Sequence, residues 1–481
     1  MVKVSHLIRE LENIVGRDYV FYHPDELLVF EYDGSIEKAW PLAVVFPTST
    51  EQVSKLVALA FREGIPAVGR GSGTGLSGGA ITSLGGLQIV LTRMDKILQV
   101  DADNRLAVVE PGVINLELDI DVRKYGLRYA PDPSSQTACS LGGNVAENAG
   151  GPHCLAYGVT TNNVLGMEVV LEDGSVTWLG GCTREVPGYD LRGVFIGSEG
   201  TFAIATKIVV KLLPTPETVR TMLGIFPDVD SACTAVSSVI GNGIIPAAIE
   251  MIDALTMRAV ERVTPSGFPD CAGAVLLIEI EGLQEEVDEI SCSVEAMLWE
   301  TGSTEVRLAD NLGDRERLWK ARKGALGALG SVAPNYYLVD GVVPRTRLAD
   351  VLRSVGQISE RHGLPIANVF HAGDGNLHPC ILFDEREPGS VERAMEAGAE
   401  ILKVCVDAGG TLTGEHGVGL EKKAYMHLVF TDEDMDTMKS VRKAFTPSNL
   451  FNPGKIFPGG PEYDRGIQSK AVASIGSDAY I

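Results

Sequence analysis

The segment His371 to His378, with the sequence His-Ala-Gly-Asp-Gly-Asn-Leu-His, carries a histidine at each end of a turn signal. Its central Asp374-Gly375 pair favours a two-residue type I′ hairpin loop, and apolar runs flank the segment on both sides. Centring the loop on this pair sets His371 directly opposite His378, with Cβ atoms about 4.5–5.5 Å apart on one face of the sheet. Two imidazoles at that separation suit a single metal ion. Asp374 is then a turn residue and not a ligand.

A second glycine-rich segment, Thr413 to Gly419, carries Glu415 and His416. Carboxylates and imidazoles bind metal ions, and an imidazole also moves protons near neutral pH. The chain has only 8 histidines, and three of them fall in these two segments. We therefore expect catalytic chemistry where the two segments act.

Composition restricts the classes of function. The 481 residues are 45% hydrophobic and 22% charged, which allows two or three domains with sizeable cores. The net charge of −23 argues against a nucleic-acid surface, because phosphate binding needs clustered Lys and Arg. No apolar run approaches the ~18 residues of a membrane span, and the N-terminus lacks signal-peptide or transit-peptide character. We therefore expect a cytoplasmic protein that is not an integral membrane protein.

The 8 cysteines include no C-x-x-C spacing, so neither an iron–sulfur cluster nor a disulfide framework is expected in this chain.

Hydrophobic patterning predicts a strand-rich region over 38–217, beginning with a strand–helix–strand unit over 42–70. Strands and helices then alternate in an order compatible with a ferredoxin-like domain: strands 220–226, 246–251, 273–281 and 304–308, and helices 228–241, 252–263 and 283–300.

We therefore predict an α+β protein with five parts. They are an N-terminal helical segment (1–37), a first domain (38–217), a second domain that carries the metal site (218–445), a C-terminal segment that returns to the first domain (446–458) and a mobile tail (459–481).

The segment Arg70-Gly-Ser-Gly-Thr-Gly-Leu-Ser-Gly-Gly79 has glycines at alternate positions. Their N–H groups can converge on an anion such as a pyrophosphate, and Arg70 adds donors. Gly73 to Gly78 also matches the G-x-G-x-x-G dinucleotide pattern. Only about eight residues separate it from the strand predicted at Leu87, however, too few for the crossover helix of a Rossmann unit. A second small-residue segment, Asp132 to Gly151, suits a backbone against which a flat ligand lies.

Four separated motifs thus occur in order: RGSGTGLSGG, DPSSQTACSLGGNVAENAGG, HAGDGNLHP and TGEHGVGLEKK, followed by Phe451-Asn-Pro-Gly-Lys455. From about residue 38 to 457 the chain resembles the D-2-hydroxyacid dehydrogenase branch of the vanillyl-alcohol-oxidase (PCMH-type) flavoproteins. This branch includes glycolate oxidase flavin subunits, D-lactate dehydrogenases and D-2-hydroxyglutarate dehydrogenases. The resemblance implies a PCMH-type FAD-binding domain over 38–217 and a ferredoxin-like substrate or cap domain with C-terminal helices over 218–445.

The resemblance also implies which residues hold FAD. Gly71 to Ala80 contains no histidine for covalent attachment, so noncovalent FAD is expected. The implied FAD contacts are Arg70, Gly71, Ser72, Gly73, Thr74, Gly75, Leu76, Pro133, Ser134, Gly142, Gly143, Asn144, Glu199, Ile204 and Asn452. For His153, a position near the flavin and a turn cap both stay open.

The resemblance further assigns the chemistry. It makes His371, His378 and Glu415 the ligands of a divalent metal, His416 the general base, and Arg322 the residue that binds the substrate carboxylate. Two imidazoles and one carboxylate suit zinc, manganese, iron or cobalt. Such an ion would lower the pKa of the substrate hydroxyl, and an imidazole suits removal of its proton near neutral pH.

The substrate and the electron acceptor follow from the same resemblance. The hydroxyglutarate enzymes carry a lysine where this chain has Leu338, which favours glycolate or D-lactate. Electrons must pass from the flavin to a partner: an iron–sulfur subunit, an electron-transfer flavoprotein, a cytochrome or a quinone pathway. Such partners could hold the enzyme at the inner face of the membrane. Three alternatives stay open: a D-2-hydroxyglutarate dehydrogenase, a flavin-bearing scaffold subunit without catalysis, and a flavin-free metallohydrolase.

Overall fold

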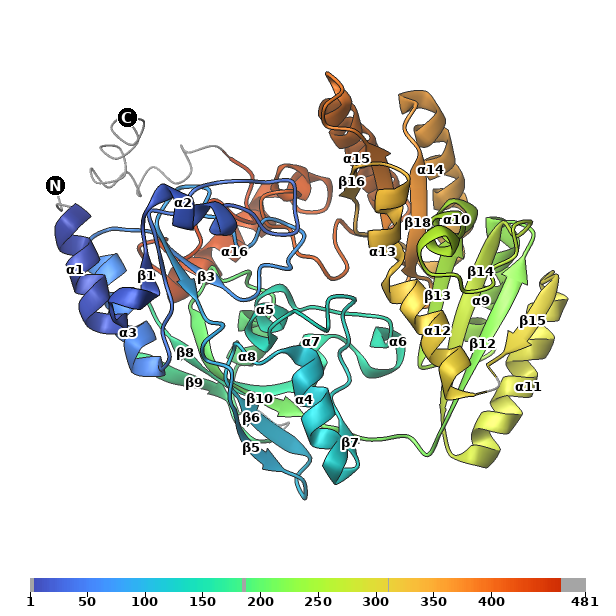
Figure 1. The fold of residues 1–481 in the computed structure, drawn as a ribbon, viewed down its shortest axis with the longest axis horizontal. Coiled ribbons are helices and arrows are strands. Elements are labelled where there is room, and N and C mark those ends of the chain that lie inside the picture. The colour runs from blue at the N-terminus through green and yellow to red at the C-terminus, as the bar shows by residue number, and fades with distance from the viewer. Residues whose placement is uncertain (1–3, 184–186, 310, 460–481) are drawn as a thin grey trace. The chain divides into compact units, whose positions relative to one another are not determined.

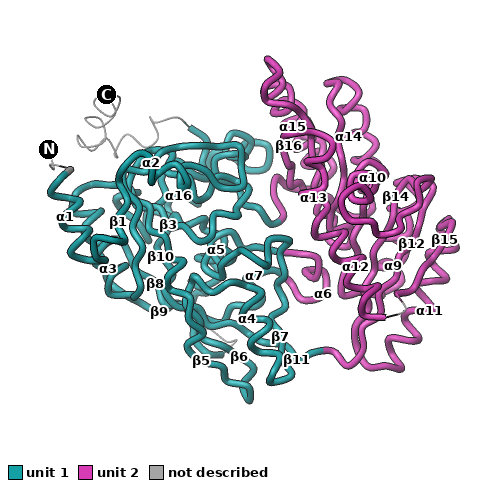
Figure 2. The backbone as a smooth tube through the Cα atoms, viewed as in Figure 1, with its two compact units in different colours: residues 1–150, 159–215, 415–481 teal, residues 151–158, 216–414 magenta. Residues whose placement is uncertain are grey.

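A computed structural model describes residues 4–183, 187–309 and 311–459 (Figure 1). The chain divides into two compact units, coloured separately in Figure 2. Unit 1 comprises residues 1–150, 159–215 and 415–481, and unit 2 comprises residues 151–158 and 216–414.

This division differs from the predicted domains in three places. The structure groups residues 1–37 and 415–445 with unit 1, and it groups the short segment 151–158 with unit 2. Residues 460–481, nearly all of the predicted mobile tail, lie outside the described residues. The Glu415-His416 pair therefore follows directly on the last residue of unit 2.

The strand that leads into the first glycine loop belongs to a four-stranded sheet of unit 1. The sheet has the order β1 (Val20–Phe21), β2 (Ala43–Val45), β4 (Leu87–Val90) and β3 (Ala67–Arg70). Helix α3 (Thr50–Arg62) joins β2 to β3, as the strand–helix–strand pattern predicts, and Ser49 caps it by accepting the Gln52 N–H. Strand β4 lies between β2 and β3 and runs parallel to both. The glycine loop starts where β3 ends.

A five-stranded antiparallel sheet completes the core of unit 1. Its order is β5 (Ile97–Asp101), β6 (Leu106–Val109), β10 (Ile204–Lys211), β8 (Val164–Val170) and β9 (Val176–Gly180). The C-terminal segment returns to this unit: Phe451 is fully buried in the core, and the Ala67 N–H donates to the Leu450 carbonyl (2.9 Å). The remaining elements of unit 1 are α1 (Val4–Val15), α2 (Pro24–Leu27), α4 (Asn115–Val122), α5 (Leu141–Glu147), α7 (Thr160–Asn163), α8 (Leu191–Phe195), α16 (Asp432–Phe445), β7 (Leu127–Arg128) and β11 (Leu213–Pro214).

Unit 2 is built on one large sheet that carries the histidine hairpin. Its order is β15 (Glu305–Leu308), β12 (Thr218–Phe226), β14 (Ala274–Gly282), β13 (Ala248–Asp253), β18 (Ile366–His371), β19 (Asn376–Leu377) and β17 (Gly341–Val342). The first four strands, with α9 (Val229–Gly241) and α11 (Gln284–Glu300) as crossovers, have the ferredoxin-like order predicted from the alternation of strands and helices. Strand β18 then extends the sheet beside β13.

The other elements of unit 2 surround this sheet. Strand β20 (Pro379–Phe383) pairs with β18 and with β16 (Asn335–Leu338). The helices are α6 (Cys154–Tyr157), α10 (Ala254–Val263), α12 (Leu312–Lys323), α13 (Ala325–Ala328), α14 (Leu348–His362) and α15 (Ser390–Asp407).

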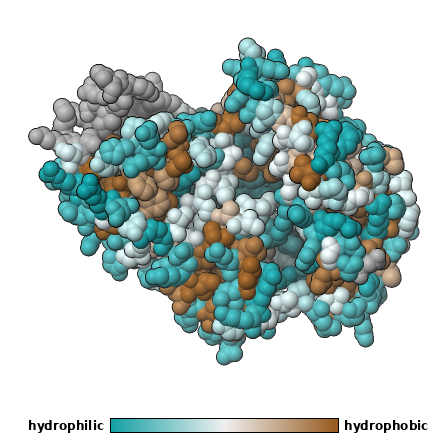
Figure 3. All heavy atoms as spheres, viewed as in Figure 1, coloured by the Kyte–Doolittle hydropathy of each residue, from teal (hydrophilic) through white to brown (hydrophobic). Residues whose placement is uncertain are grey.

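Hydrophilic residues cover most of the face drawn in Figure 3, interrupted by smaller hydrophobic patches. Within residues 4–183, 187–309 and 311–459, no helix combines the length and the hydropathy needed to cross a bilayer.

Candidate active site

The hairpin that carries both histidines has a different register from the predicted one. Strand β18 pairs so that His371 faces Asn376, and the loop contains the four residues Ala372 to Gly375. The predicted two-residue loop, with His371 directly opposite His378, is therefore wrong. A type I′ turn needs positive φ at both central residues, but Gly375 alone in this fully described loop has it (71°).

Neighbouring strands explain the longer loop. The Gly373 N–H donates to the Ile249 carbonyl (3.1 Å), and the Gly375 carbonyl accepts the Val343 N–H (2.9 Å). The loop backbone thus bonds to residues that are distant in sequence, in addition to the bonds that close it, from the Asp374 N–H to the His371 carbonyl (3.2 Å) and from the Gly375 N–H to the Ala372 carbonyl (3.3 Å). The Asp374-Gly375 pair alone cannot predict these contacts with distant residues.

The two histidines nevertheless meet, because the register is shifted by two residues. Side chains in a strand alternate between faces, so a shift of two keeps His378 on the same face as His371. The ring centroids are 5.1 Å apart, with the ring planes at 84°. A ring nitrogen of each histidine lies within 4.8 Å of a ring nitrogen of the other, and both side chains are buried. This pair fits a cation bound by two imidazoles.

Glu250 orients one histidine of the pair. It lies on β13 directly opposite His371 on β18, and its side chain is fully buried. The Nδ1–H of His371 donates to the carboxylate, at 2.9 and 3.0 Å from the two oxygens. This hydrogen bond makes Nε2 the ring nitrogen that can bind a cation, as carboxylates do for metal-bound histidines in general.

Arg322 lies on the other side of the same carboxylate. Its Nη2 is 2.5 Å from Oε2 of Glu250, close enough for an ion pair but without hydrogen-bond direction, and the side chain is 3% exposed. The buried Nε–H has no hydrogen-bond partner within the part of the chain that the structure describes. A buried guanidinium with an unused donor is suited to a carboxylate ligand.

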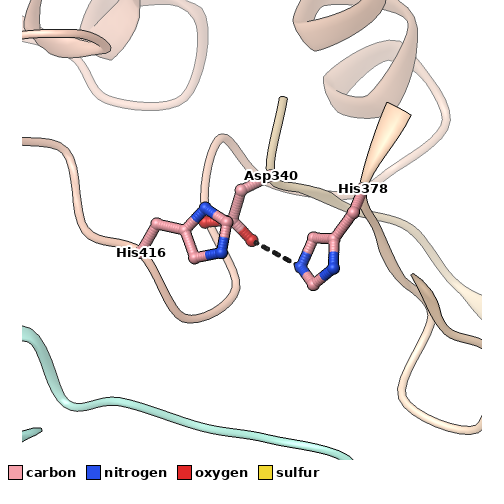
Figure 4. Close-up of side chains that lie close together, drawn as sticks. All are labelled: Asp340, His378 and His416. Atoms are coloured by element: carbon pink, nitrogen blue, oxygen red, sulfur yellow. Dashed lines mark ion pairs between the residues drawn. The ribbon is translucent and has the colours of Figure 1, made fainter. Parts of the chain in front are cut away.

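Asp340 ties the hairpin to the segment that precedes Glu415. Its buried carboxylate accepts the Asn376 side-chain amide (2.9 Å), the Thr413 hydroxyl (2.5 Å) and the Gly414 N–H (3.1 Å). Oδ1 of Asp340 also lies 3.7 Å from Nε2 of His378 (Figure 4). Because Gly414 is the last residue of unit 2, Asp340 fixes the backbone from which the next residue, Glu415, extends.

Glu415 and His416 open the last segment of unit 1. Their side chains are half-buried, with Nε2 of His416 3.8 Å from Oε1 of Glu415. Two residues further on, the N–H groups of Val418 and Gly419 donate to the two oxygens of Glu199, each at 2.7 Å. Glu199, for which the resemblance implies an FAD contact, thus holds this loop through both carboxylate oxygens.

The first glycine loop has the features of an anion site. Arg70 is buried at the end of β3, and burial lowers the pKa of its guanidinium. Nη1 of Arg70 has no hydrogen-bond partner among the described residues. The guanidinium covers Gly73 so closely that a Cβ there would lie 2.2 Å from Nη2, and the φ of Gly73 is +72°. An unused buried donor beside bare backbone fits the pyrophosphate of a dinucleotide.

The second small-residue segment lies against this loop within unit 1. A Cβ on Gly71 would be 2.2 Å from Oγ of Ser140. Ser140 caps α5 by accepting the Gly143 N–H (3.3 Å). A Cβ on Gly142 would be 2.7 Å from Cβ of Pro111. Glycine at 71 lets the two segments lie against each other, and glycine at 142 lets the second segment lie against Pro111. The resulting backbone-lined surface fits FAD.

The other residues with implied FAD contacts surround these loops. The Asn452 side-chain amide donates to the carbonyls of Gly79 (2.8 Å) and Glu199 (2.7 Å). Asn144 accepts the Asn115 side-chain amide (3.0 Å). Ile204 begins β10 and is buried. The remaining ones are Ser72, Thr74, Gly75 and Leu76, which are half-buried, Pro133, which is buried, and Ser134, which is exposed.

Sequence reasoning missed three carboxylates: Glu250 and Asp340, which are buried, and Glu147, which is half-buried. Glu147 ends α5 with its Oε1 2.3 Å from the position of a Cβ on Gly79. Burial and the neighbouring carboxylate of Glu199 raise its pKa well above the ordinary value. A usable signal for Glu250 is a charged residue inside the apolar strand Ala-Ile-Glu-Met-Ile-Asp, because a buried charge needs a partner.

Comparison with known proteins places these loops in a family. Residues 41–180 match an FAD binding domain, and residues 215–456 match the family described as FAD linked oxidases, C-terminal domain. The chain belongs to the FAD-linked oxidase family. It is 45% identical over 457 residues to glycolate oxidase subunit GlcD of Escherichia coli (strain K12), covering 95% of this chain and 91% of that protein. It is 32% identical over 414 residues to the D-lactate dehydrogenase of Archaeoglobus fulgidus, covering 86% and 90%.

The fold also matches a solved structure, p-cresol methylhydroxylase with substrate bound. The TM-score is 0.78 at 18% identity, covering 94% of this chain and 96% of that one. This likeness confirms the predicted α+β fold of PCMH type. The family resemblance and the prediction of an FAD-dependent oxidoreductase are confirmed by the family matches.

Proposed function

We propose that this protein oxidises a small D-2-hydroxy acid, glycolate or D-lactate, to the 2-oxo acid, using noncovalent FAD and a divalent metal. The observation that carries the proposal is the buried arrangement of His371, Glu250 and Arg322. A cation-binding imidazole pair lies next to a guanidinium with an unused donor. A 2-hydroxy acid has the matching groups, since its hydroxyl and carboxylate oxygens sit on adjacent carbons. The names of the two relatives support this class of substrate.

His371, His378 and Glu415 would hold the metal with two nitrogens and one oxygen, leaving positions for substrate. This donor set suits zinc, manganese, iron or cobalt. When bound, the ion lowers the pKa of the substrate hydroxyl and thereby helps its proton to leave. The Glu250 hydrogen bond fixes which nitrogen of His371 is the ligand.

The proton and the carboxylate are handled by residues of this chain. Arg322 binds the substrate carboxylate through its unused Nε–H, which orients the acid. His416 accepts the hydroxyl proton as general base. Asp340 and Glu199 hold the backbone on either side of His416, which limits the positions that its ring can take.

FAD would lie on the surface formed by the two glycine loops, with Arg70 next to its pyrophosphate. Bound there, FAD would supply the acceptor for the hydride on the carbon that carries the hydroxyl group. The proposed acceptor of the electrons is a partner: an iron–sulfur subunit, an electron-transfer flavoprotein, a cytochrome or a quinone pathway. The name of the Escherichia coli relative, a subunit, supports a protein partner.

The length of the acid is the finer part of the proposal. Leu338 is 6% exposed on β16, opposite Cys380 of β20. A leucine at that position supplies no cation for a second carboxylate, which supports a monocarboxylate substrate.

An anaerobic titration tests the proposal. The purified flavin-loaded protein is mixed with glycolate, D-lactate, L-lactate or D-2-hydroxyglutarate while the visible absorption of the flavin is followed. We expect glycolate or D-lactate to bleach the flavin and L-lactate to leave it oxidised. Bleaching by none of the acids, or equal bleaching by both lactates, would contradict the proposal. Preferential bleaching by hydroxyglutarate would overturn the assignment of a short acid.

A further inference from the structure

Helix α12 carries two arginines that each share a buried glutamate with a histidine. In the first group, Arg322 and His371 contact Glu250. In the second group, Arg315 and His153 contact Glu279. All these residues belong to unit 2.

The geometry of the sheet and of the helix explains the repetition. Arg315 and Arg322 are two helical turns apart, so both lie on the same side of α12. Glu279 on β14 faces Ala248 on β13, and Glu250 is two residues further along β13, on the same face of the sheet. One side of the helix thus meets both carboxylates.

These polar contacts matter because α12 has little apolar surface. Seven of its twelve residues are charged in the sequence Leu-Gly-Asp-Arg-Glu-Arg-Leu-Trp-Lys-Ala-Arg-Lys. Its buried apolar residues are Leu318, Trp319 and Ala321, so specific polar contacts help to fix its position. The two buried glutamates provide these contacts for α12.

The two groups differ in how fully the arginine is engaged. Arg315 donates to both oxygens of Glu279, through Nε and Nη2 at 2.8 Å each. The Trp319 indole (2.6 Å) and the Thr221 hydroxyl (2.8 Å) complete the shell of Glu279. Arg322, in contrast, has only an ion-pair contact with Glu250, and its Nε–H is unused. The Glu250 group therefore keeps an arginine donor for a ligand carboxylate, whereas Nε and Nη2 of Arg315 are both engaged by Glu279.

We propose that Glu250 is a positioning residue for the catalytic site. It selects Nε2 of His371 as the metal-binding nitrogen, and it holds Arg322 so that the unused Nε–H of the guanidinium receives the substrate carboxylate. The inference rests on the proposed function, since it concerns the same site. Glu279 has the same burial and the same kinds of partners, but none of the predicted metal ligands is among them.

Metal affinity tests this role without any turnover. The purified full-length protein, its Glu250→Ala and Glu250→Gln variants and the matched Glu279→Ala and Glu279→Gln variants are dialysed against a series of free Zn²⁺ concentrations. Bound zinc is then measured. Zinc is a suitable probe because sites of this donor type bind it more tightly than manganese or iron.

We expect Glu250→Ala to weaken zinc affinity about 10- to 100-fold, the usual effect of losing a carboxylate partner of a metal-bound histidine. The Glu279 variants should stay within about threefold of the wild type, below that range. Equal zinc affinity of the Glu250 variants and the wild type would overturn the proposal. An equal loss of zinc affinity in the Glu250 variants and the Glu279 variants would also overturn it, because it would show a general effect of removing a buried carboxylate.

Two further readouts complete the test. Glu250→Gln keeps the side-chain volume, so it serves if the alanine variant does not fold. At saturating zinc it should raise the KM for the acid, whereas Glu279→Gln should not; an unchanged KM would refute the Arg322 half of the proposal. If the wild type itself binds no zinc, the proposed metal-dependent function fails. If it binds zinc and Glu250→Ala binds it equally well, only the role of Glu250 fails.

Discussion

Replacing Arg322 with lysine tests how this residue binds the substrate. Lysine keeps the positive charge beside Glu250; in the wild type, Nη2 of Arg322 lies 2.5 Å from Oε2 of Glu250. It lacks the planar fork, so it can offer only one of the two parallel hydrogen bonds that a guanidinium gives a carboxylate. A hydrogen bond to a charged group contributes about 1.5–3 kcal/mol. At about 1.4 kcal/mol per factor of ten, kcat/KM should fall roughly 10- to 150-fold.

The assay is anaerobic stopped-flow bleaching of the flavin at several concentrations of the acid that the titration identifies. Arg315→Lys is the matched control, since Arg315 lies two turns away on α12 and uses Nε and Nη2 on Glu279. The control should lose stability but keep its kcat/KM. If Arg322→Lys stays within about twofold of the wild type, well below the loss expected for a hydrogen bond to a charged group, Arg322 does not clamp the carboxylate. An equal loss in both variants would instead indicate a general disturbance of α12.

His416→Ala should slow flavin bleaching about 10²- to 10⁴-fold, the usual contribution of a general base, while flavin and metal contents stay unchanged; an undiminished rate would show that another group removes the proton. Burial favours the protonated form of Glu279, but Arg315 and His153 outweigh it and hold its pKa well below 4.5. In acid, the folded state therefore binds fewer protons than the unfolded state. The stabilisation that ionised Glu279 gives the folded state is present above about pH 4.5 and is lost as the pH falls. We expect urea unfolding to show this between pH 5 and pH 3: the free energy of unfolding of the wild type should fall by up to about 1.4 kcal/mol per pH unit more than that of Glu279→Gln. Parallel plots of the unfolding free energy against pH for the two proteins would contradict this. Gly142→Ala would place a Cβ 2.7 Å from Cβ of Pro111 and 3.0 Å from its carbonyl oxygen, an overpacking that costs about 1–3 kcal/mol, so flavin titration of the apoprotein should show weaker FAD binding. FAD affinity equal to that of the wild type would mean that the loop does not form the cofactor surface.

The alternation of apolar and polar residues predicted most of the elements of unit 2. The helix expected over 228–241 is found at Val229–Gly241, and the strand expected over 273–281 is found at Ala274–Gly282. These elements have strong periodicity and clear caps, such as Asp228, whose side chain accepts the Ser231 N–H. The local sequence was sufficient for these elements because periodicity and capping residues lie within or next to each element.

The hairpin and the buried carboxylates needed information that is not local. The Asp374-Gly375 signal favoured a two-residue loop, but contacts from Ile249 and Val343 select a four-residue one. Glu250 meets His371 across 121 positions of sequence, and the pairing of β13 with β18 brings them together. A glutamate in an apolar strand indicates a buried partner, but it does not identify that partner.

Removal and return of the metal test the central claim most directly. The flavin-loaded protein is stripped with a chelator, mixed anaerobically with the acid that it oxidises, and then given back zinc, manganese, iron or cobalt. We predict that the stripped protein keeps an oxidised flavin in the presence of the acid. One of the ions should restore bleaching in the wild type but not in the His378→Ala variant. Undiminished bleaching of the metal-free protein would contradict a metal-dependent oxidation at this site.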